Sequence, residues 1–375
     1  MPSIYLHIPF CKQACHYCDF HFSTSLKNTS AMVEALAKEL FLRKDELQGE
    51  VETIYFGGGT PSLLTIFDLR FLIDTIYKNY TVIENPEITL EANPDDLTKE
   101  KIKALADSPV NRLSIGVQSF FEDDLKLMNR AHNAEEAKNC LSVAARHFDN
   151  ISIDLIYGIP NMTNERWLQN VEKALSFNIP HISAYALTVE AKTALKKMIE
   201  KGTIPPMDEA LAEQHFFSLA DVLEKNHFIH YELSNFGKEG YFSKNNTAYW
   251  TGKSYLGIGP SAHSYDGKNR SWNIANNTLY IKSIIENKLP SETETLTKTD
   301  RYNEYIMTGL RTMFGVSLEK VKQDFGEKYY QYLSEQAQRF LEQELLVIEE
   351  NTLKITHKGK FIGDGVSAEL FFVGE

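Results

Sequence analysis

The sequence predicts an α/β fold, in which an incomplete barrel of six strand-and-helix units is followed by a mostly helical, winged-helix-like C-terminal domain. Two observations predict it. Short runs rich in β-branched and aromatic residues alternate with stretches of apolar residues at helical spacing through the first half of the chain. Toward the C-terminus, helical stretches are instead followed by two short strand-like runs around a turn. Repeated strand-then-helix units favour a parallel sheet with outer helices, and their number favours an incomplete barrel over an open sheet, which spacing alone does not exclude.

Composition and residue spacing indicate where the individual strands and helices lie. The strands are expected in the β-branched and aromatic runs at residues 3–8, 52–58, 87–92, 111–117, 150–158 and 181–189. The helices are expected where apolar residues recur at helical spacing, over residues 30–47, 65–80, 98–108, 134–148 and 163–177. Thr29 or Ser30 is a suitable N-cap for the first of them.

The remaining chain divides into two further segments, which with residues 1–236 makes three predicted units. Residues 237–290 are richer in Pro, Gly and Asn and are expected to bridge or close over the barrel mouth. Residues 291–375 are expected to form helices and a small hairpin, as in a winged helix. Acidic residues throughout those helices favour a packing or partner role over DNA binding.

Composition and charge limit the possible partners and compartments. The chain has 375 residues and a formal net charge of -12, which disfavours binding to bulk nucleic acid. No apolar run is long enough to cross a bilayer, and no secretion signal opens the sequence. We therefore expect a cytoplasmic protein in a reducing compartment, where cysteines serve as ligands rather than as disulfides.

Three of the four cysteines lie within eight positions. Cys11, Cys15 and Cys18 have the spacing C-x3-C-x2-C, which allows one loop to hold three corners of a cubic iron–sulfur cluster and leaves one iron open. A zinc site with His7, His16 or His21 as fourth ligand is the alternative, although zinc ligands more often come as two separated pairs. Cys140 lies within a predicted helix, where a buried, small apolar side chain is the expected role.

The stretch "YLHIPFCKQACHYCDF" resembles the cluster loop of radical S-adenosylmethionine (SAM) proteins. The resemblance is to the group that contains oxygen-independent coproporphyrinogen III oxidases and HemW-type haem chaperones. It extends in the same order through "YFGGGTPSLL", "ITLEANPDDLT", "NRLSIGVQSF", "ISIDLIYGIP", "YELSNF" and "YLGIGPSAHSY", which together span most of the first 275 residues. The resemblance implies a radical-SAM barrel, a 4Fe-4S cluster and a SAM molecule that is cleaved to a 5'-deoxyadenosyl radical.

The resemblance also implies roles for residues at the strand ends. The glycine run with Thr60 would hold the SAM amino group, Arg130 would pair with the SAM carboxylate, and Glu91, Gln118 and Asp154 would bind the ammonium or ribose hydroxyls. Tyr17 matches the position that covers the adenine, and Tyr5 matches another contact. The implied SAM residues are Tyr5, Tyr17, Gly58, Gly59, Thr60, Glu91, Gln118, Arg130 and Asp154.

Two features favour the HemW-type chaperones over the oxidases within this group. Oxidases of the group carry a fourth cysteine two residues after the third, where this chain has Phe20. They also carry an N-terminal extension, whereas ten residues precede Cys11 here. The predicted function is therefore a protein that binds haem and delivers it to acceptors such as membrane-associated respiratory proteins. Oxidative decarboxylation of coproporphyrinogen III is the alternative.

The haem site is implied by a His-Asn-x-x-Tyr-Trp motif of the HemW-type chaperones. Here Asn246, Tyr249 and Trp250 match the motif, but Asn245 replaces the histidine, and a carboxamide is a poor ligand for haem iron. The two aromatic rings can still stack on a porphyrin, or simply pack in a core. Another histidine would then supply the iron ligand, with His227, His230 and His263 as candidates.

Overall fold

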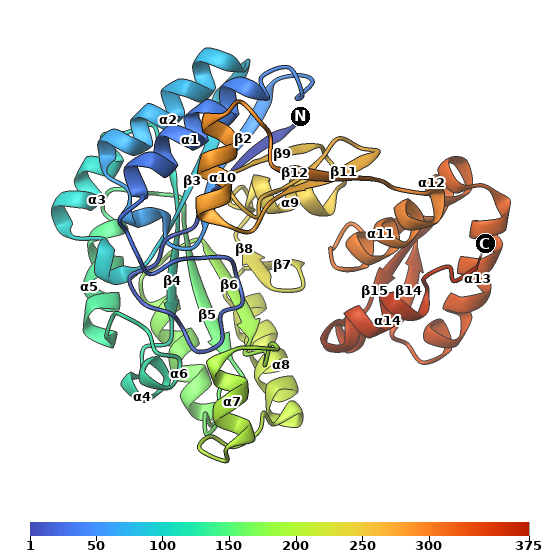
Figure 1. The fold of residues 1–375 in the computed structure, drawn as a ribbon. Coiled ribbons are helices and arrows are strands. Elements are labelled where there is room, and N and C mark those ends of the chain that lie inside the picture. The colour runs from blue at the N-terminus through green and yellow to red at the C-terminus, as the bar shows by residue number, and fades with distance from the viewer. Residues whose placement is uncertain (375) are drawn as a thin grey trace.

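The computed structural model describes residues 1–374 and confirms the predicted architecture of a partial barrel followed by a helical domain (Figure 1). Six neighbouring parallel strands form the barrel, and the central strand β4 is buried along its whole length. Such continuous burial is expected where helices cover a parallel sheet. The barrel strands are β1 (Ser3–Ile8), β2 (Val51–Gly58), β3 (Val82–Ala92), β4 (Arg112–Gln118), β5 (Ile151–Tyr157) and β6 (His181–Ala186).

Helices cover the outer face of these strands, as Figure 1 shows for α1, α2, α3 and α5. Several begin at threonine caps: the Thr65 hydroxyl accepts the Asp68 N–H in a capping box, and Thr98 and Thr163 cap α3 and α6. Helix α1 instead begins after Asn28, which makes no capping hydrogen bond, so the Thr29 or Ser30 cap was wrong. The barrel helices are α1 (Thr29–Leu42), α2 (Ile66–Asn79), α3 (Lys99–Ala106), α4 (Glu122–Leu127), α5 (Ala134–Ala144), α6 (Asn164–Leu175), α7 (Ala194–Glu200) and α8 (Glu209–Lys225).

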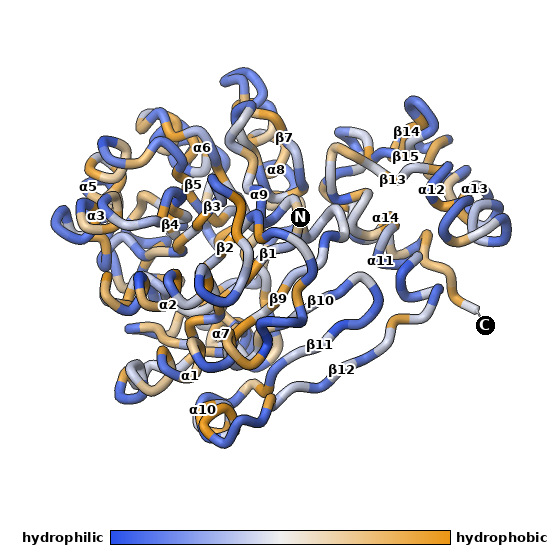
Figure 2. The backbone as a smooth tube through the Cα atoms, turned by 90° about the horizontal axis from the view of Figure 1, so that it is seen from above, coloured by the Kyte–Doolittle hydropathy of each residue, from blue (hydrophilic) through white to orange (hydrophobic). Residues whose placement is uncertain are grey.

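Further strands extend the barrel sheet at both edges, giving the order β12-β11-β10-β9-β1-β2-β3-β4-β5-β6-β8-β7. Strand β9 is parallel to β1, and β10, β11 and β12 follow as an antiparallel ribbon that is largely hydrophilic in Figure 2. Residues 237–290 thus continue the sheet beside β1, and none of them lines the cavity of about 500 Å³ at the barrel mouth, where closure was expected. The added elements are β7 (Ile229–Glu232), β8 (Asn235–Gly237), α9 (Lys244–Trp250), β9 (Tyr255–Ile258), β10 (His263–Tyr265), β11 (Asn269–Asn273), α10 (Asn277–Ile285) and β12 (Ser291–Thr295).

The C-terminal domain has its own hydrophobic core, which runs from Tyr302 to Phe372. Three short antiparallel strands and a set of helices form it, in agreement with the predicted winged-helix-like arrangement. Figure 1 shows it beside the barrel, with α11 on the side nearest α9, and the two helices are in contact. Its elements are α11 (Lys298–Leu310), β13 (Val316–Ser317), α12 (Leu318–Lys320), a π-helical turn (Val321–Phe325), α13 (Glu327–Glu342), β14 (Leu346–Glu349), β15 (Thr352–Ile355), a 3-10 helix (His357–Ile362) and α14 (Gly363–Glu369).

Within residues 1–374, no helix combines the length and the apolar character needed to cross a bilayer.

Candidate functional site

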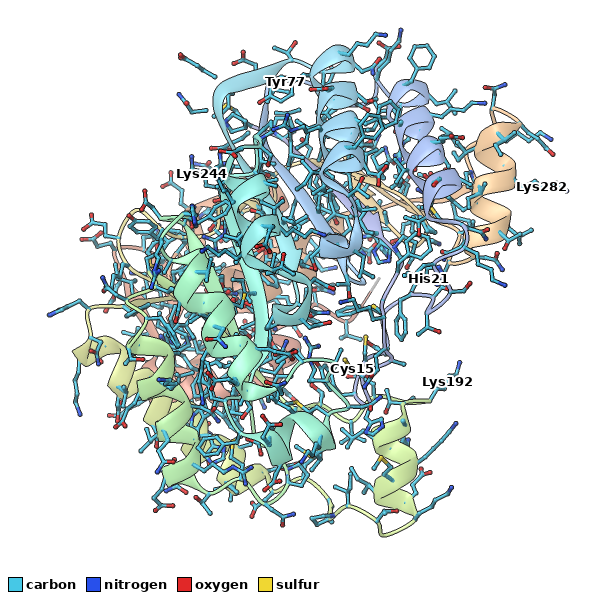
Figure 3. All side chains as sticks on the ribbon, turned by 90° about the vertical axis from the view of Figure 1, so that its left-hand side faces the viewer. Cys15, His21, Tyr77, Lys192, Lys244 and Lys282 are labelled. Atoms are coloured by element: carbon cyan, nitrogen blue, oxygen red, sulfur yellow. The ribbon has the colours of Figure 1, made fainter. Side chains whose placement is uncertain are left out.

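The loop that carries the three cysteines follows β1 and is held on both sides. Its backbone bonds to the end of α4, where His16 N donates to Met128 O at 3.0 Å, and to the start of α7, where Leu195 N donates to His16 O at 2.8 Å. Figure 3 shows Cys15 beside the segment of Lys192 that leads into α7. The loop is therefore fixed by backbone contacts with α4 and α7 together with bonds within its own segment, such as that from Cys11 N to Ser23 O.

The thiols face polar groups that suit sulfur anions. Thr60 Oγ1 donates to Cys11 Sγ at 3.4 Å, and Arg130 Nη1 donates to Cys15 Sγ at 3.3 Å. Burial raises the pKa of Cys18 to about 11, against a backbone hydrogen bond from Phe20 that lowers it. A metal cluster would therefore have to displace the thiol protons, as thiolate-bound metals do.

Backbone and carboxylate groups meet at the end of β2. Gly58 has φ +102°, and a Cβ there would lie 2.5 Å from the His7 ring, so only glycine fits. Glu91, on the neighbouring strand β3, accepts the Gly58 N–H at 3.1 Å and the Tyr55 hydroxyl at 2.8 Å. Burial raises the pKa of Glu91 to about 7, although both hydrogen bonds lower it. Glu91 is thus a buried carboxyl poised to accept a cation.

Arg130 lies between the cysteine loop and the strand ends. Its Nη2 donates to Asn93 Oδ1 at 2.6 Å and to Gly116 O at 3.0 Å, and its Nη1 donates to the Tyr17 hydroxyl at 3.3 Å. Its Nε is buried and has no hydrogen-bond partner within the described chain. A buried donor without a partner is costly, so this guanidinium has capacity to bind a further acceptor such as a carboxylate.

Gln118 is the last residue of β4, whereas Asp154 lies at the middle of the neighbouring strand β5. The Ser114 hydroxyl donates to the Asp154 carboxylate at 3.1 Å, and Ser152 Oγ donates at 3.3 Å. Burial raises the pKa of Asp154 to about 6, against these serine hydrogen bonds. Gln118 has φ +66°, a left-handed conformation that ends the strand and places its amide beside Gly116.

These residues surround one cavity of about 500 Å³ at the carboxyl ends of the strands. Of the predicted cluster and SAM residues, all but Tyr5 line it: Cys11, Cys15, Cys18, Tyr17, Gly58, Gly59, Thr60, Glu91, Gln118, Arg130 and Asp154. The Tyr5 hydroxyl instead meets His7 Nδ1 at 3.2 Å. Sequence reasoning missed Asn93, Ser114 and Tyr185, which also line the cavity; Asn93 and Ser114 lie in motifs that were recognised, but their side-chain direction depends on register.

The three histidines considered as zinc ligands have other partners. His7 Nε2 lies 2.9 Å from His21 O, His16 Nδ1 lies 2.8 Å from Leu127 O, and His21 Nε2 lies 2.7 Å from Asn277 Oδ1. Burial lowers the pKa of His7 to about 4, so its ring is neutral. Across residues 1–374, no three Cys, His, Asp or Glu side chains converge as the ligands of a single metal ion would, the three cysteines included.

The residues predicted to bind haem lie elsewhere. Tyr249 and Trp250 line a second cavity, of about 760 Å³, between α9 and the C-terminal domain, whereas Asn246 lines neither cavity. Asn245 is buried, and its Oδ1 accepts the Thr53 hydroxyl at 3.0 Å. The residue that replaces the expected histidine therefore serves the packing of α9 on β2.

A partial β/α barrel with three cysteines on the loop after its first strand, and a glycine run at the end of its second, defines a radical SAM protein. The family model of the radical SAM superfamily matches residues 5–183, and that of the HemN C-terminal domain matches residues 296–362. Two curated relatives, both named heme chaperone HemW, match nearly the whole chain. The Bacillus subtilis (strain 168) protein is 34% identical and covers 100% of both chains, and the Lactococcus lactis (strain IL1403) protein is 36% identical over 97% of this chain and 96% of its own. The chain belongs to the HemW family.

A solved structure shows the same fold. Coproporphyrinogen III oxidase (HemN) from Escherichia coli, described as a radical SAM enzyme, has a TM-score of 0.85 and 22% identity, covering 99% of this chain and 90% of its own. At that identity the similarity concerns the fold alone, and it includes the C-terminal domain.

Proposed function

We propose that this protein is a haem chaperone that holds a 4Fe-4S cluster and SAM in the barrel, binds haem and delivers it to acceptor proteins. The observation that carries the proposal is the match along the whole chain to relatives named heme chaperone HemW. Phe20 supports it, because an exposed phenylalanine lines the cavity where an oxidase of this group has its fourth cysteine. The expected compartment is the cytoplasm, and membrane-associated respiratory proteins are the expected acceptors.

Cys11, Cys15 and Cys18 are proposed to bind three irons of the cluster. Their thiols share the cavity with groups that match each part of SAM: the Glu91 carboxylate for the ammonium, the free Nε of Arg130 for the carboxylate, and Asp154 with Gln118 for the ribose. The reduced cluster would supply one electron to the bound SAM. The surrounding residues orient the cofactor, and Tyr17, held by Arg130, covers it.

The function is tested by following haem and porphyrin chemistry in one anaerobic preparation. Protein reconstituted with iron and sulfide is first titrated with haemin, and transfer to an apo-acceptor is then followed by absorbance with and without SAM. A parallel sample receives SAM, a strong reductant and coproporphyrinogen III, and 5'-deoxyadenosine and decarboxylated porphyrin are separated by chromatography. We expect haem binding and transfer without decarboxylated product. Product formed over many turnovers would establish the oxidase instead.

The raised pKa of Glu91 predicts that, as pH rises, the apoprotein becomes less stable while its affinity for SAM increases. Burial raises that pKa to about 7 in the folded protein, whereas the ordinary pKa of a glutamate in an unfolded chain is near 4. The protonated carboxyl therefore stabilises the folded apoprotein most at a pH below about 4, and this contribution is lost as the pH rises through about 7. Glutamine does not titrate. The free energy of unfolding of Glu91→Gln, relative to that of the wild-type apoprotein, should therefore be higher at pH 8 than at pH 5 by on the order of 2 kcal/mol, as measured by urea unfolding.

The same variant should bind SAM more weakly. Only the ionised carboxyl attracts the SAM ammonium, so wild-type affinity should fall as pH drops below about 7, and the variant should lose this pH dependence. Isothermal titration at pH 6 and pH 8 measures both. Exposed Glu50→Gln is the matched control, and equal SAM affinity of the two variants would remove Glu91 from the proposed site.

A further inference from the structure

The cavity between α9 and the C-terminal domain has a volume of about 760 Å³, which is large enough to hold a sizeable ligand. Its walls come from parts of the chain far apart in sequence: α9, the ribbon of β10 and β11, α11, and the turn that follows α11. Figure 1 shows α11 facing the barrel across this region. The cavity is separate from the one that holds the cysteines, and the two share no lining residue.

Aromatic rings line the barrel side of this cavity. The rings of Tyr249 and Tyr255 meet edge to face with centroids 4.5 Å apart, and Tyr265 follows at 6.1 Å from Tyr255. Trp250 adds an indole, packed against the Arg311 guanidinium at 4.9 Å. Such a wall offers broad, flat apolar contact, which a planar ring system can use.

The rim carries cations, one of which has no acidic partner. Arg270 pairs with Glu294 and Glu304, and Lys320 pairs with Asp324 at 3.8 Å. Arg301, on α11, is exposed, lines the cavity, and makes no ion pair with any described residue. A guanidinium in this position can bind a carboxylate of a ligand in the cavity.

Met307, also on α11, supplies a soft donor. It is partly exposed and lines the cavity, and a thioether is an established axial ligand of haem iron. No histidine or cysteine of the described chain lines this cavity, so His227, His230 and His263 are all outside it. The tyrosines of the cavity are poor candidates for the iron ligand, because burial raises the pKa of Tyr255, Tyr265 and Tyr305 and keeps their phenols protonated.

We propose that haem binds in this interdomain cavity, with Met307 as an axial iron ligand, Arg301 paired with a propionate, and the Tyr249 and Trp250 side of the cavity against the porphyrin. This rests on the proposed haem-chaperone function and adds the iron ligand that Asn245 cannot provide. The first cavity is assigned to the cluster and SAM. A third, of about 400 Å³, is smaller and has a mixed lining, in which Ser, Thr, Asn and acidic side chains outnumber the apolar and aromatic ones. The C-terminal domain thus supplies Met307 and Arg301, and the barrel side supplies the wall with Tyr249 and Trp250.

The proposal is tested with the full chain by haemin titration, followed by absorbance and electron paramagnetic resonance. We expect Met307→Leu to remove the sulfur-to-iron charge-transfer band of the ferric protein and to weaken haemin binding by about tenfold or more. Arg301→Gln should weaken binding by about twofold to fivefold, with the band retained, because a partly exposed ion pair is lost. Protoporphyrin IX, which lacks iron, should respond to Arg301→Gln but not to Met307→Leu.

Met313→Leu and Arg146→Gln are the matched controls, since both residues are exposed and neither lines the cavity. The cluster absorption and SAM affinity of every variant should equal those of the wild type. If the wild type binds no haemin, the proposed function fails. If it binds haemin and Met307→Leu keeps both the affinity and the charge-transfer band, the function stands and this site is overturned.

Discussion

We expect Cys15→Ala to abolish assembly of the iron–sulfur cluster and, with it, any cleavage of SAM. The chain has four cysteines, and the fourth, Cys140, is buried on α5, away from the cavity. No other thiol can therefore replace the missing ligand. Loss of Cys15 would also remove one acceptor from Arg130, whose Nη1 donates to its sulfur. Anaerobic reconstitution, with iron and acid-labile sulfide counted per chain and the absorbance of the cluster recorded, measures the effect.

Cys140→Ala provides the matched control. Its thiol is surrounded by apolar side chains of the barrel core, so the substitution should cost about 1 kcal/mol of stability and leave iron and sulfide content unchanged. Normal cluster content in Cys15→Ala, measured in the same preparation, would contradict the assignment of the C-x3-C-x2-C loop as the cluster site.

The barrel could be predicted from sequence because local patterns and tertiary structure agree there. Each expected parallel strand has an apolar run that is largely buried beneath the outer helices. The helices expected at residues 65–80 and 163–177 also start at Thr65 and Thr163, which cap them in the structure. Residues toward the carboxyl ends of neighbouring strands, such as Glu91 on β3 and Gln118 on β4, meet in one cavity because parallel strands end on the same edge of the sheet. This part of the site follows from topology.

The features that the sequence did not predict depend on contacts between segments far apart in the chain, which no local pattern encodes. Asn245 stands where the motif has a histidine. It is buried because α9 packs on β2, and Thr53 donates a hydrogen bond to its side chain. Tyr5 lies on the same side of the sheet as Glu91, but its ring stacks on Tyr55 and its hydroxyl meets His7, so it does not itself line the cavity. Met307 and Arg301 carry no motif at all, and only the placement of α11 opposite α9 brings them to a cavity.

The sheet extension beside β1 is joined to the barrel by a buried polar network, and its disruption should produce the largest loss of stability. Glu39, fully buried on α1, accepts the Gly259 N–H at 2.8 Å and an Asn273 amide N–H at 2.7 Å, and it also accepts the Tyr280 hydroxyl. Arg43 supplies the compensating charge, with Nη1 at 3.2 Å from Glu39 and 2.9 Å from Gly257 O.

Removing that charge leaves the carboxylate buried and unpaired. We expect Arg43→Met to lower the free energy of unfolding by about 3–5 kcal/mol at pH 8, measured by urea unfolding, whereas exposed Arg146→Met should change it by less than about 0.5 kcal/mol. Burial already raises the pKa of Glu39 although Arg43 lowers it, so the substitution should raise that pKa further.

The pH dependence of the stability lost in Arg43→Met identifies the cause of that loss. A carboxyl whose pKa is raised on folding contributes most below its unfolded pKa and loses that contribution as pH rises, so the deficit of Arg43→Met should shrink as pH falls from 8 to 5 and the buried Glu39 becomes protonated. A deficit that stays constant over this range would assign it to lost packing of the arginine side chain instead. Because Gly259 is held by Glu39 and lies against His7, the same variant should also loosen the first strand that leads into the cysteine loop.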